Sequence, residues 1–269
     1  MIRFVVFSLS LMIMGQLWAE PAPFRFGVSP QKSASQLAAA WTPFLDYLSQ
    51  HSGVPLIFST ATDSASFSRR LKAGDFDFCF VNPQQYLLLH DDPGYEAFAR
   101  EKGRLLKGLL VTHKDSTVHD LAALQGAELA FPSPTSFAAS VLPQAELRQA
   151  GIEFTPRYVG SHASVYLNVA KRLVPAGGGI TRSLELAPPE VRSELRVLLT
   201  TAGYTPHAIA SHPRIDADAL ARLRAAVRRL ENDPDAGEIL KSIGFRGIQV
   251  ADDRDWDGLR ELALPAPPQ

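Results

Sequence analysis

Neutral polar side chains gather in short segments that follow the expected strands of this sequence. Hydroxyl, amide and imidazole groups all donate hydrogen bonds without adding a fixed charge. A helix that starts beside such groups adds free backbone N–H groups and the positive end of its dipole. This combination binds a small oxyanion without a lysine. The candidate ligand-binding residues are Ser29, Asn82, Gln84, Ser133, Thr135, Ser136, Ser161, His162 and Tyr204.

Each candidate also has a purely structural interpretation, and both interpretations stay open at this point. Ser133, Ser136 and Ser161 are typical helix N-caps, and a Ser-His pair is typical of a turn. His162 titrates near neutrality and can donate through one or both ring nitrogens. Tyr204 follows an expected strand and is expected at a hinge or at the rim of a pocket.

Catalysis and metal binding are not favoured, so we expect no enzyme, no metal and no cofactor. Ser161 and His162 are adjacent in the sequence, which places them poorly as a nucleophile and its base. No Gly-x-Ser-x-Gly motif occurs, and no convincing pair of carboxylates lies in the expected loops. The histidine pairs are too loosely spaced for a metal site without acids nearby. Cys79, the single cysteine, lies in an apolar strand, which excludes an intramolecular disulfide and predicts an inert buried thiol.

The charge balance excludes a nucleic-acid-binding protein. The chain of 269 residues carries 27 Lys and Arg against 28 Asp and Glu, a formal net charge of -1. A nucleic-acid-binding domain usually has a strong excess of basic residues. The composition, 46% hydrophobic and 20% charged, is that of a globular protein. An anionic ligand must therefore be held by local groups and not by the overall charge.

The first residues predict export. Residues 1–19 form an expected signal peptide, with Arg3 before an apolar run and Ala19 at the cleavage point. The run is shorter than the roughly 20 residues that span a bilayer, although an uncleaved anchor is the alternative. No cysteine near Ala19 could accept a lipid, and no later stretch is apolar enough for a membrane helix. We expect a monomeric, periplasmic protein that is not embedded in the membrane.

Strands and helices alternate along the chain. This alternation predicts an α/β fold with mostly parallel sheets, whose ligands bind at the carboxyl ends of the strands. Strands are expected at 24–28, 55–60, 76–81, 107–112, 128–131, 157–160 and 196–201. Helices are expected around 37–48, from 63 or 64 to about 74, after 83, at 136–149, at 161–172, after 216 and after 233.

A few local patterns lead to more specific predictions. Pro43 predicts a kink or a split in the first helix. The run Gly177–Gly179 is interpreted as a tight turn, because no Lys-Ser or Lys-Thr follows it as in a phosphate loop. The arginines from Arg222 to Arg229 are expected on a solvated helix face. Residues 264–269 are expected to form a flexible, proline-rich tail.

Several motifs carry a family resemblance. From Phe24 to about Ala263 the chain resembles the phosphate/phosphite/phosphonate-binding proteins of bacterial ABC transporters. The matching segments are Phe26-Gly27-Val28-Ser29-Pro30, Trp41 to Leu48, Gly74 to Phe80, Asp120-Leu121-Ala122-Ala123-Leu124-Gln125-Gly126, Phe131 to Ser136 and Gly160-Ser161-His162. The order and spacing of these segments over most of the chain make the resemblance specific.

The resemblance implies a two-lobed type II periplasmic binding protein with two hinge crossings. Residues 20–112 and 205–269 would form lobe 1, and residues 113–204 would form lobe 2. The implied function is capture of a small oxyanion, such as phosphate, phosphite or a phosphonate, and its delivery to an ABC permease. The alternative is a receptor domain that presents a small anion to a membrane sensor such as a sensor kinase.

The sequence also departs from the family pattern. Where the family's anion loop continues Ser-Thr-Ser-Gly, this chain reads Ser136-Phe137-Ala138-Ala139, so two hydroxyls are missing. Val81 stands where the family often has an aromatic hydroxyl, and Pro175 stands where aminoalkylphosphonate binders have an aspartate. A buried ammonium would lack a carboxylate partner in this lobe, which is costly. The sequence therefore predicts a ligand without an amine.

Overall fold

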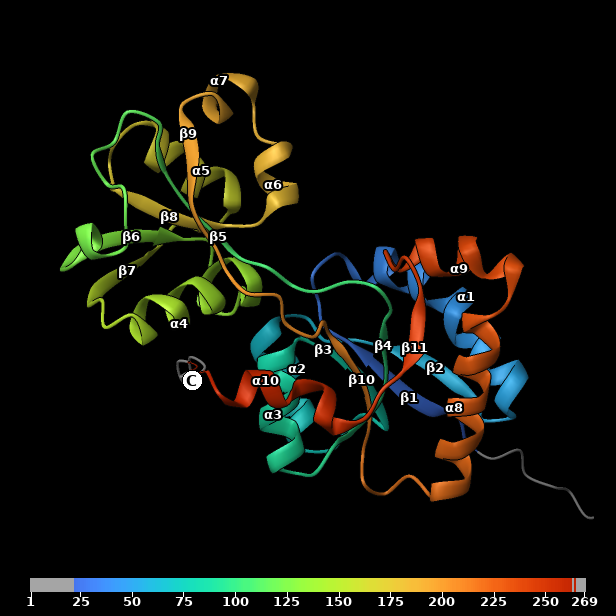
Figure 1. The fold of residues 1–269 in the computed structure, drawn as a ribbon. Helices are drawn as coiled ribbons and strands as arrows, with labels where there is room; N and C mark the ends of the chain where they lie inside the picture. The colour runs from blue at the N-terminus through green and yellow to red at the C-terminus, as the bar shows by residue number, and fades with distance from the viewer. Residues whose placement is uncertain (1–21, 263, 265–269) are drawn as a thin grey trace, which may run out of the picture.

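The computed structural model describes residues 22–262 and 264, and these form two α/β lobes (Figure 1). The sheet of the first lobe has the strand order β11-β4-β10-β3-β1-β2, and that of the second has β7-β6-β8-β5-β9. The first sheet contains β1 (Phe24–Val28), β2 (Leu56–Ser59), β3 (Phe78–Val81), β4 (Glu96–Glu101), β10 (Ala208–Ser211) and β11 (Ile248–Val250). The second contains β5 (Leu109–His113), β6 (Ala127–Phe131), β7 (Phe154–Tyr158), β8 (Ala176–Gly179) and β9 (Leu195–Thr200).

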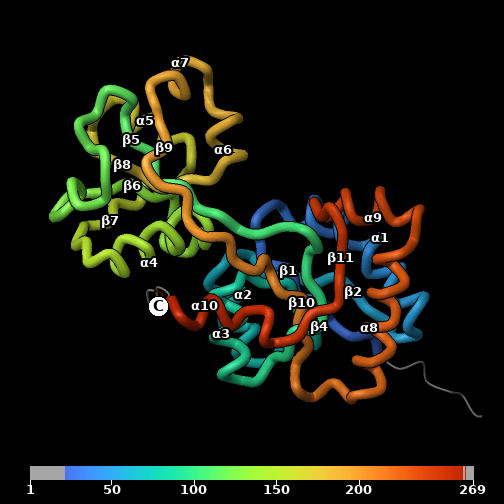
Figure 2. The backbone as a smooth tube through the Cα atoms, in the orientation of Figure 1, coloured from blue at the N-terminus to red at the C-terminus, as the bar shows by residue number. Residues whose placement is uncertain are grey.

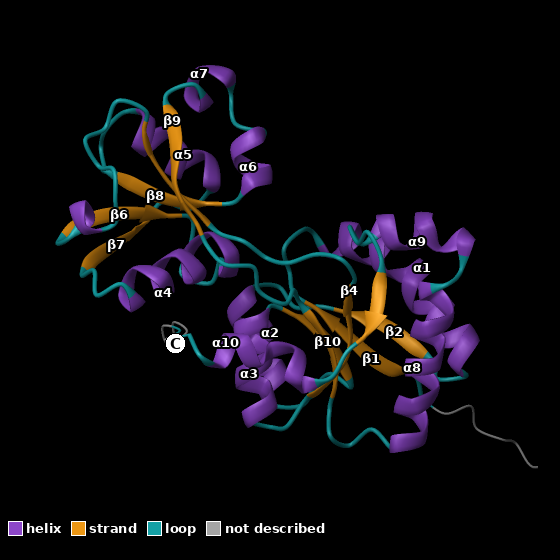
Figure 3. Ribbon diagram, viewed as in Figure 1, coloured by secondary structure: helices purple, strands orange, loops and turns teal. Residues whose placement is uncertain are grey.

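Helices cover both faces of each sheet (Figure 3). In the first lobe, α1 (Ala34–Ser52), α8 (Ala217–Glu231) and α9 (Gly237–Ser242) bury one face, and α2 (Ser64–Lys72), α3 (Pro83–Asp91) and α10 (Asp257–Arg260) bury the other. In the second lobe, α4 (Leu142–Gln149) lies on one face, and α5 (His162–Ala170), α6 (Thr181–Glu185) and α7 (Pro189–Arg192) lie on the other. Short helical turns complete the chain: η1 (Ala122–Leu124), η2 (Phe137–Val141), η3 (Pro234–Ala236) and η4 (Asp253–Trp256).

The predicted two-lobed α/β fold is confirmed, but both sheets are mixed and not mostly parallel. In the first, β1 is parallel to β2 and β3, whereas β10 is antiparallel to β3 and β4. In the second, β6 is parallel to β7 and β8, whereas β5 is antiparallel to β8 and β9. The reason is the route of the chain between the lobes. Because β5 and β10 enter their sheets at the edge where the parallel strands end, they must run against those strands.

Two crossing segments, residues 102–108 and 201–207, join the lobes side by side (Figure 2). Leu106 and Tyr204 exchange backbone hydrogen bonds of 2.8 and 3.0 Å. Gly108 N–H donates to Thr201 Oγ1 at 2.9 Å. The predicted boundary at residue 112 falls inside β5, which belongs to the second sheet. The division into lobe 1 (residues 20–112 and 205–269) and lobe 2 (residues 113–204) stays a prediction.

Helix α1 runs unbroken past its internal proline, so of the two alternatives predicted at Pro43, a kink or a split, the split is wrong. Ser33 and Gln36 form a capping box at its start, and Gly53 ends it in the left-handed conformation. Pro43 lies on the exposed side, while the opposite stripe of Leu37, Trp41, Phe44, Leu45 and Leu48 is buried. That burial outweighs the one backbone hydrogen bond that a proline removes.

The glycine run is the central strand β8, and its interpretation as a tight turn is wrong. A Cβ atom on Gly177 would lie 2.5 Å from Val165 Cγ1 of α5. A Cβ on Gly178 would lie 2.0 Å from the carbonyl oxygen of Ala139. The strand is therefore made of glycines because α5 and η2 press against its two faces more closely than any side chain permits.

Several other local predictions are resolved by the described residues. Cys79 is buried, as predicted, and Trp41 is buried as well. Arg224 departs from the predicted solvated face, since it donates to the carbonyl oxygens of Ala251 at 2.8 Å and Ala97 at 3.0 Å. Strands β4, β10 and β11 had no counterpart among the predicted strands.

Two predictions fall at the chain ends. The predicted signal peptide lies outside the described residues, as does the predicted tail apart from Leu264. Between residues 22 and 262, no helix is long and apolar enough to cross a membrane.

Candidate functional site

The carboxyl edge of the first sheet carries Ser29 and Asn82. These residues follow β1 and β3, which are parallel neighbours with Val28 opposite Phe80. Asn82 caps α3, because its Oδ1 accepts from the N–H of Gln85 at 2.9 Å. Gln84, in the first turn of α3, is buried. The structure thus brings these three predicted residues to the edge that faces the crossing segments.

The carboxyl edge of the second sheet carries Ser133 and Ser161. They follow β6 and β7, which are also parallel neighbours. The backbone N–H of Gly160 donates to the carbonyl oxygen of Pro132 at 2.9 Å, which holds the two loops together. Both crossing segments connect the carboxyl edge of one sheet to the carboxyl edge of the other. The carboxyl edge of the second sheet, with Ser133 and Ser161, therefore faces that of the first, with Ser29 and Asn82.

The crossing segments divide the space between the facing edges into two sides (Figures 1 and 3). We call one the α4 side, where η2 and α4 meet α2, α3 and α10. We call the other the α5 side, where α5 and α6 lie on the same side as α1 and α9. The assignment of faces follows from the buried clusters that each helix joins.

The α4 side is an apolar junction. Ser136 precedes η2, a turn of π-helix, and its side chain makes no capping hydrogen bond. Phe137 is 5% exposed, and it belongs to the same buried cluster as Val81 and Tyr86 of the first lobe. Tyr204, on a crossing segment, packs against this cluster, and burial raises the pKa of its hydroxyl. Thr135, which precedes Ser136, is exposed.

The α5 side is polar. Ser161 caps α5 by accepting from the N–H of Ser164 at 3.1 Å. His162 Nδ1 lies 3.1 Å from Ser183 Oγ, which also bonds Tyr166 Oη at 2.6 Å. Partial burial lowers the pKa of His162, so its ring is neutral at pH 7. Among the described residues Nε2 of this ring has no hydrogen-bond partner, which leaves it for a ligand.

A cavity of about 220 Å³ opens at the carboxyl edge of the first sheet, and sequence reasoning missed it. Its polar residues are Gln31, Glu101, Arg104 and His207, and Phe80 and Phe245 form its apolar wall. The strand β4, whose end supplies Glu101, was not predicted, so nothing in the sequence marked Arg104 as a residue of the carboxyl edge. The signal that the sequence offered for Arg104 was its position in a polar segment between two apolar runs.

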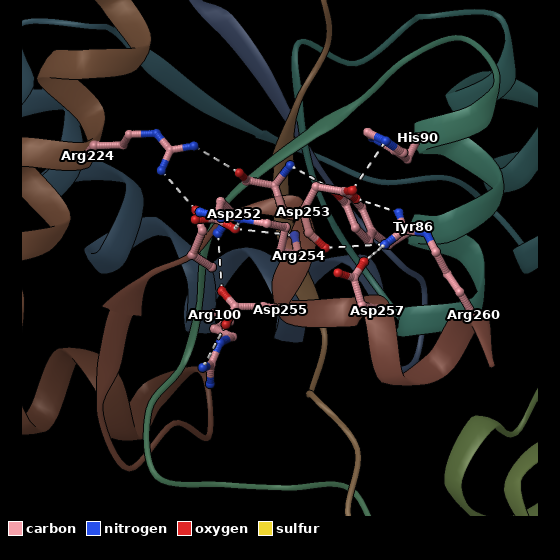
Figure 4. Close-up of polar contacts among 12 residues, drawn as sticks. Tyr86, His90, Arg100, Arg224, Asp252, Asp253, Arg254, Asp255, Asp257 and Arg260 are labelled. Atoms are coloured by element: carbon pink, nitrogen blue, oxygen red, sulfur yellow. Dashed lines mark hydrogen bonds and ion pairs between the residues drawn. The ribbon is translucent and has the colours of Figure 1, made fainter. Parts of the chain in front are cut away.

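The C-terminal segment, residues 251–262, holds the second crossing segment against the first lobe. Asp253 accepts from Tyr86 Oη at 2.9 Å and pairs with Arg260 at 2.6 Å (Figure 4). Trp256 Nε1–H donates to the carbonyl oxygen of Pro206 at 3.0 Å. Although histidine and several aspartates meet here, the described residues contain no group of three or more metal-ligating side chains suited to a metal ion.

Comparisons with known proteins give one consistent match. The sequence model of a family described as "ABC transporter, phosphonate, periplasmic substrate-binding protein" matches residues 26–256. A Xanthomonas citri protein bound to chloride ion is similar in structure, with a TM-score of 0.74, 23% identity, and coverage of 86% of this chain and 92% of that one.

Two further solved structures share the fold. PhnD1 from Prochlorococcus marinus, in complex with methylphosphonate, has a TM-score of 0.69 and 17% identity, covering 90% and 97% of the two chains. A binding protein component of an ABC phosphonate transporter from Pseudomonas aeruginosa has a TM-score of 0.66 and 19% identity, covering 88% and 84%.

Proposed function

This chain belongs to the periplasmic substrate-binding proteins of phosphonate ABC transporters, and from that membership we propose that it captures a small oxyanion between its lobes and delivers it to a membrane permease. The ligand class is phosphate, phosphite or a small phosphonate. The family's role in transport favours a permease over a sensor kinase as the membrane partner.

The observation that carries this proposal is the facing of the two carboxyl edges. Both crossing segments join the sheets at these edges, so neutral polar residues of two lobes face one gap. Helices that begin at these edges, such as α3 after Asn82 and α5 after Ser161, direct the positive ends of their dipoles there. The methylphosphonate and chloride bound by similar structures support an anion as the ligand.

Binding would act by shifting the population of open and closed forms. A ligand that contacts both edges stabilises the closed form by the contacts that only that form offers. The crossing segments suit a hinge, because Leu106 and Tyr204 pair while the residues on each side belong to different sheets. Neutral donors such as His162 hold an anion by hydrogen bonds and release it more readily than a buried lysine would.

The two acidic residues between Phe131 and Ile180, Glu146 and Glu153, do not suit a buried ammonium group. Glu146 accepts from the N–H of Ala202 at 2.8 Å, which ties it to the crossing segment. Glu153 lies in the loop before β7 and is exposed. We therefore propose a ligand without an amine.

A thermal-shift screen tests the proposal. Phosphate, phosphite, methylphosphonate and sulfate are each added to the full-length protein, with tris-acetate as the reference. A ligand at 100 times its Kd should stabilise the protein by about 2.7 kcal/mol. If none of the oxyanions raises the Tm, the proposed function is wrong.

A pair of histidine variants then locates the ligand. His162→Ala should weaken binding about tenfold by calorimetry with little change in the Tm of the unliganded protein, because a charge-assisted hydrogen bond is lost. His51→Ala is the control, since His51 also lies on a helix and bonds a backbone carbonyl oxygen, that of Tyr47, at 2.8 Å. Equal affinities of the two variants would make His162 structural.

A further inference from the structure

We propose that Arg104 binds the anionic oxygens of the ligand, in the hinge pocket that it forms with Gln31 and His207. This inference rests on the proposed function and names the cation of that site. The anionic group is the phosphate or phosphonate head of the ligand. The pocket is the cavity of about 220 Å³ at the carboxyl edge of the first sheet.

The pocket is formed where several elements end. Gln31 follows β1, Phe80 lies in β3, Glu101 ends β4, and His207 precedes β10. Leu106 and Pro206, one from each crossing segment, also line it. A ligand in this pocket therefore touches both the first lobe and the hinge, and its binding is coupled to the hinge angle.

Arg104 is the side chain in this pocket that can hold an anion directly. Its side chain is 40% exposed, and its one hydrogen-bond acceptor among the described residues is Glu101, at 3.3 Å. Guanidinium carries five N–H donors in a fork that matches the oxygens of a phosphate or phosphonate. One long contact to Glu101 leaves most of these donors for a ligand.

Glu101 keeps the guanidinium in place. This carboxylate is 4% exposed and accepts from Arg104 Nη1 and from the backbone N–H of Arg246, at 3.2 Å for the latter. With both oxygens engaged, it anchors Arg104 and is poorly available to a cationic ligand. An anion at the other donors of Arg104 would share one cation with Glu101, which favours a modest affinity and ready release.

His207 completes the recognition of a single anion. Its ring stacks on Phe80 with centroids 5.0 Å apart. Burial and the nearby Arg104 cation lower its pKa to about 4, so the ring is neutral at pH 7 and can donate one hydrogen bond. The charged groups that line the pocket with it are Arg104 and Glu101. An anion bound beside the ring would raise its pKa, because a negative charge stabilises the imidazolium.

The pocket lies on the side of the crossing segments where polar groups of the second lobe are available. It is lined by the loop after α9 and by Gln31, which lies two residues before Ser33, the N-cap of α1. These elements lie on the α5 side, the side of His162 (Figure 1). On the α4 side, Phe137 and Ala138 replace two hydroxyls of the family's anion loop, so a cation at Arg104 would compensate for the lost donors.

Calorimetry with phosphate and with methylphosphonate tests the proposal. Arg104→Gln should weaken binding at least tenfold, because a charged bidentate contact is lost. Arg246→Gln is the matched control, since this exposed arginine lies in the loop that borders the pocket, and its affinity should stay within twofold of the wild type. Because Arg104→Gln leaves Glu101 buried without its cation, the double variant Glu101→Gln/Arg104→Gln is measured as well. It should fold and show the same loss.

The pKa of His207 gives an independent result. In NMR titrations of the wild type, saturating methylphosphonate should raise this pKa by at least one unit. Wild-type affinity in both Arg104 variants, or an unchanged His207 pKa at saturation, would overturn the assignment of Arg104 and leave the proposed function intact. A wild-type protein that binds none of the oxyanions would overturn the proposed function itself.

Discussion

The α4 side and the α5 side of the crossing segments differ in chemistry, since the first is an apolar junction and the second is polar. On the α4 side, Phe137 of the second lobe is buried with residues of the first, and the adjacent Ser136 makes no side-chain cap. On the α5 side, Ser161 caps its helix, and the Nε2 of His162 has no hydrogen-bond partner within residues 22–262. One side therefore contributes cohesion between the lobes, and the other is the side on which we propose that the ligand is recognised.

The close packing at the α4 side depends on how closely the backbone of η2 approaches two glycines. The carbonyl oxygens of Ala138 and Ala139 lie against Gly108 and Gly178, where a Cβ would be 2.2 and 2.0 Å away. Such contacts place η2 directly on β8 and on the end of the first crossing segment. The apolar substitution at Phe137 therefore belongs to a packed junction and not to an empty anion loop.

The largest effect should come from truncating the α4-side cluster. Trp256 is fully buried and packs against Tyr86 with ring centroids 4.8 Å apart. Trp256→Ala should lower the free energy of unfolding by about 3–5 kcal/mol in urea denaturation, the usual cost of an emptied aromatic site. Leu167→Ala, at a 41% exposed position of α5, should change it by less than about 0.5 kcal/mol. Similar losses of unfolding free energy in both variants would show that the α4-side cluster is not the more important source of stability.

The second effect is a dependence of stability on pH that originates on the α5 side. His207 has a pKa of about 4 in the folded protein, whereas an unfolded histidine has about 6.5. The unfolded chain thus binds a proton first as the pH falls, and stability is lost between pH 6.5 and 4, by up to about 3 kcal/mol. Comparing urea denaturation at pH 7 and pH 4.5, His207→Gln should lose less stability than the wild type. Parallel losses would show that His207 is not responsible.

A smaller effect tests the backbone approach at the α4 side. Gly178→Ala should destabilise the protein by about 1–3 kcal/mol, because the carbonyl oxygen of Ala139 must move away from the new methyl group. Gly237→Ala is the control, since a Cβ at this helical position meets nothing within 4 Å and should be neutral or slightly stabilising. Thermal denaturation of both variants measures the difference.

Sequence reasoning succeeded where local signals agree with the fold. The strand Phe24–Val28 and the helix that ends at Gly53 were both predicted, because apolar periodicity and capping residues mark them. It failed for β8, because a run of glycines has no side-chain period, and the strand is defined by its pairing with β5 and β6, while α5 and η2 leave room only for glycine. Strand β11, of three residues, is too short to show a period.

The candidate site was predictable only in part, for the same reason. Ser161 and Asn82 follow recognisable strands and precede recognisable helices, so their positions at the carboxyl edges could be predicted. Arg104 follows β4 (Glu96–Glu101), in which apolar and charged residues do not alternate regularly enough to mark one apolar face. Its place at the edge depends on the pairing of β4 with β10 and β11, which is decided by contacts distant in sequence.

The smallest effect distinguishes a cap from a ligand contact at Ser161. The Oγ of this residue accepts from the N–H of Ser164, so Ser161→Ala should cost about 1 kcal/mol of stability, whereas Ser161→Gly should cost only a few tenths. If Ser161 also donates to the bound oxyanion, both variants should lose affinity alike in calorimetry, because both lack the hydroxyl. Asn82→Ala and Asn82→Gly repeat the measurement at the cap of α3, whose side chain accepts from the N–H of Gln85. If at either position the Ala variant loses more affinity than the Gly variant, in parallel with its larger loss of stability, the side chain acts only by capping the helix. Ligand recognition would then depend on His162 and Arg104.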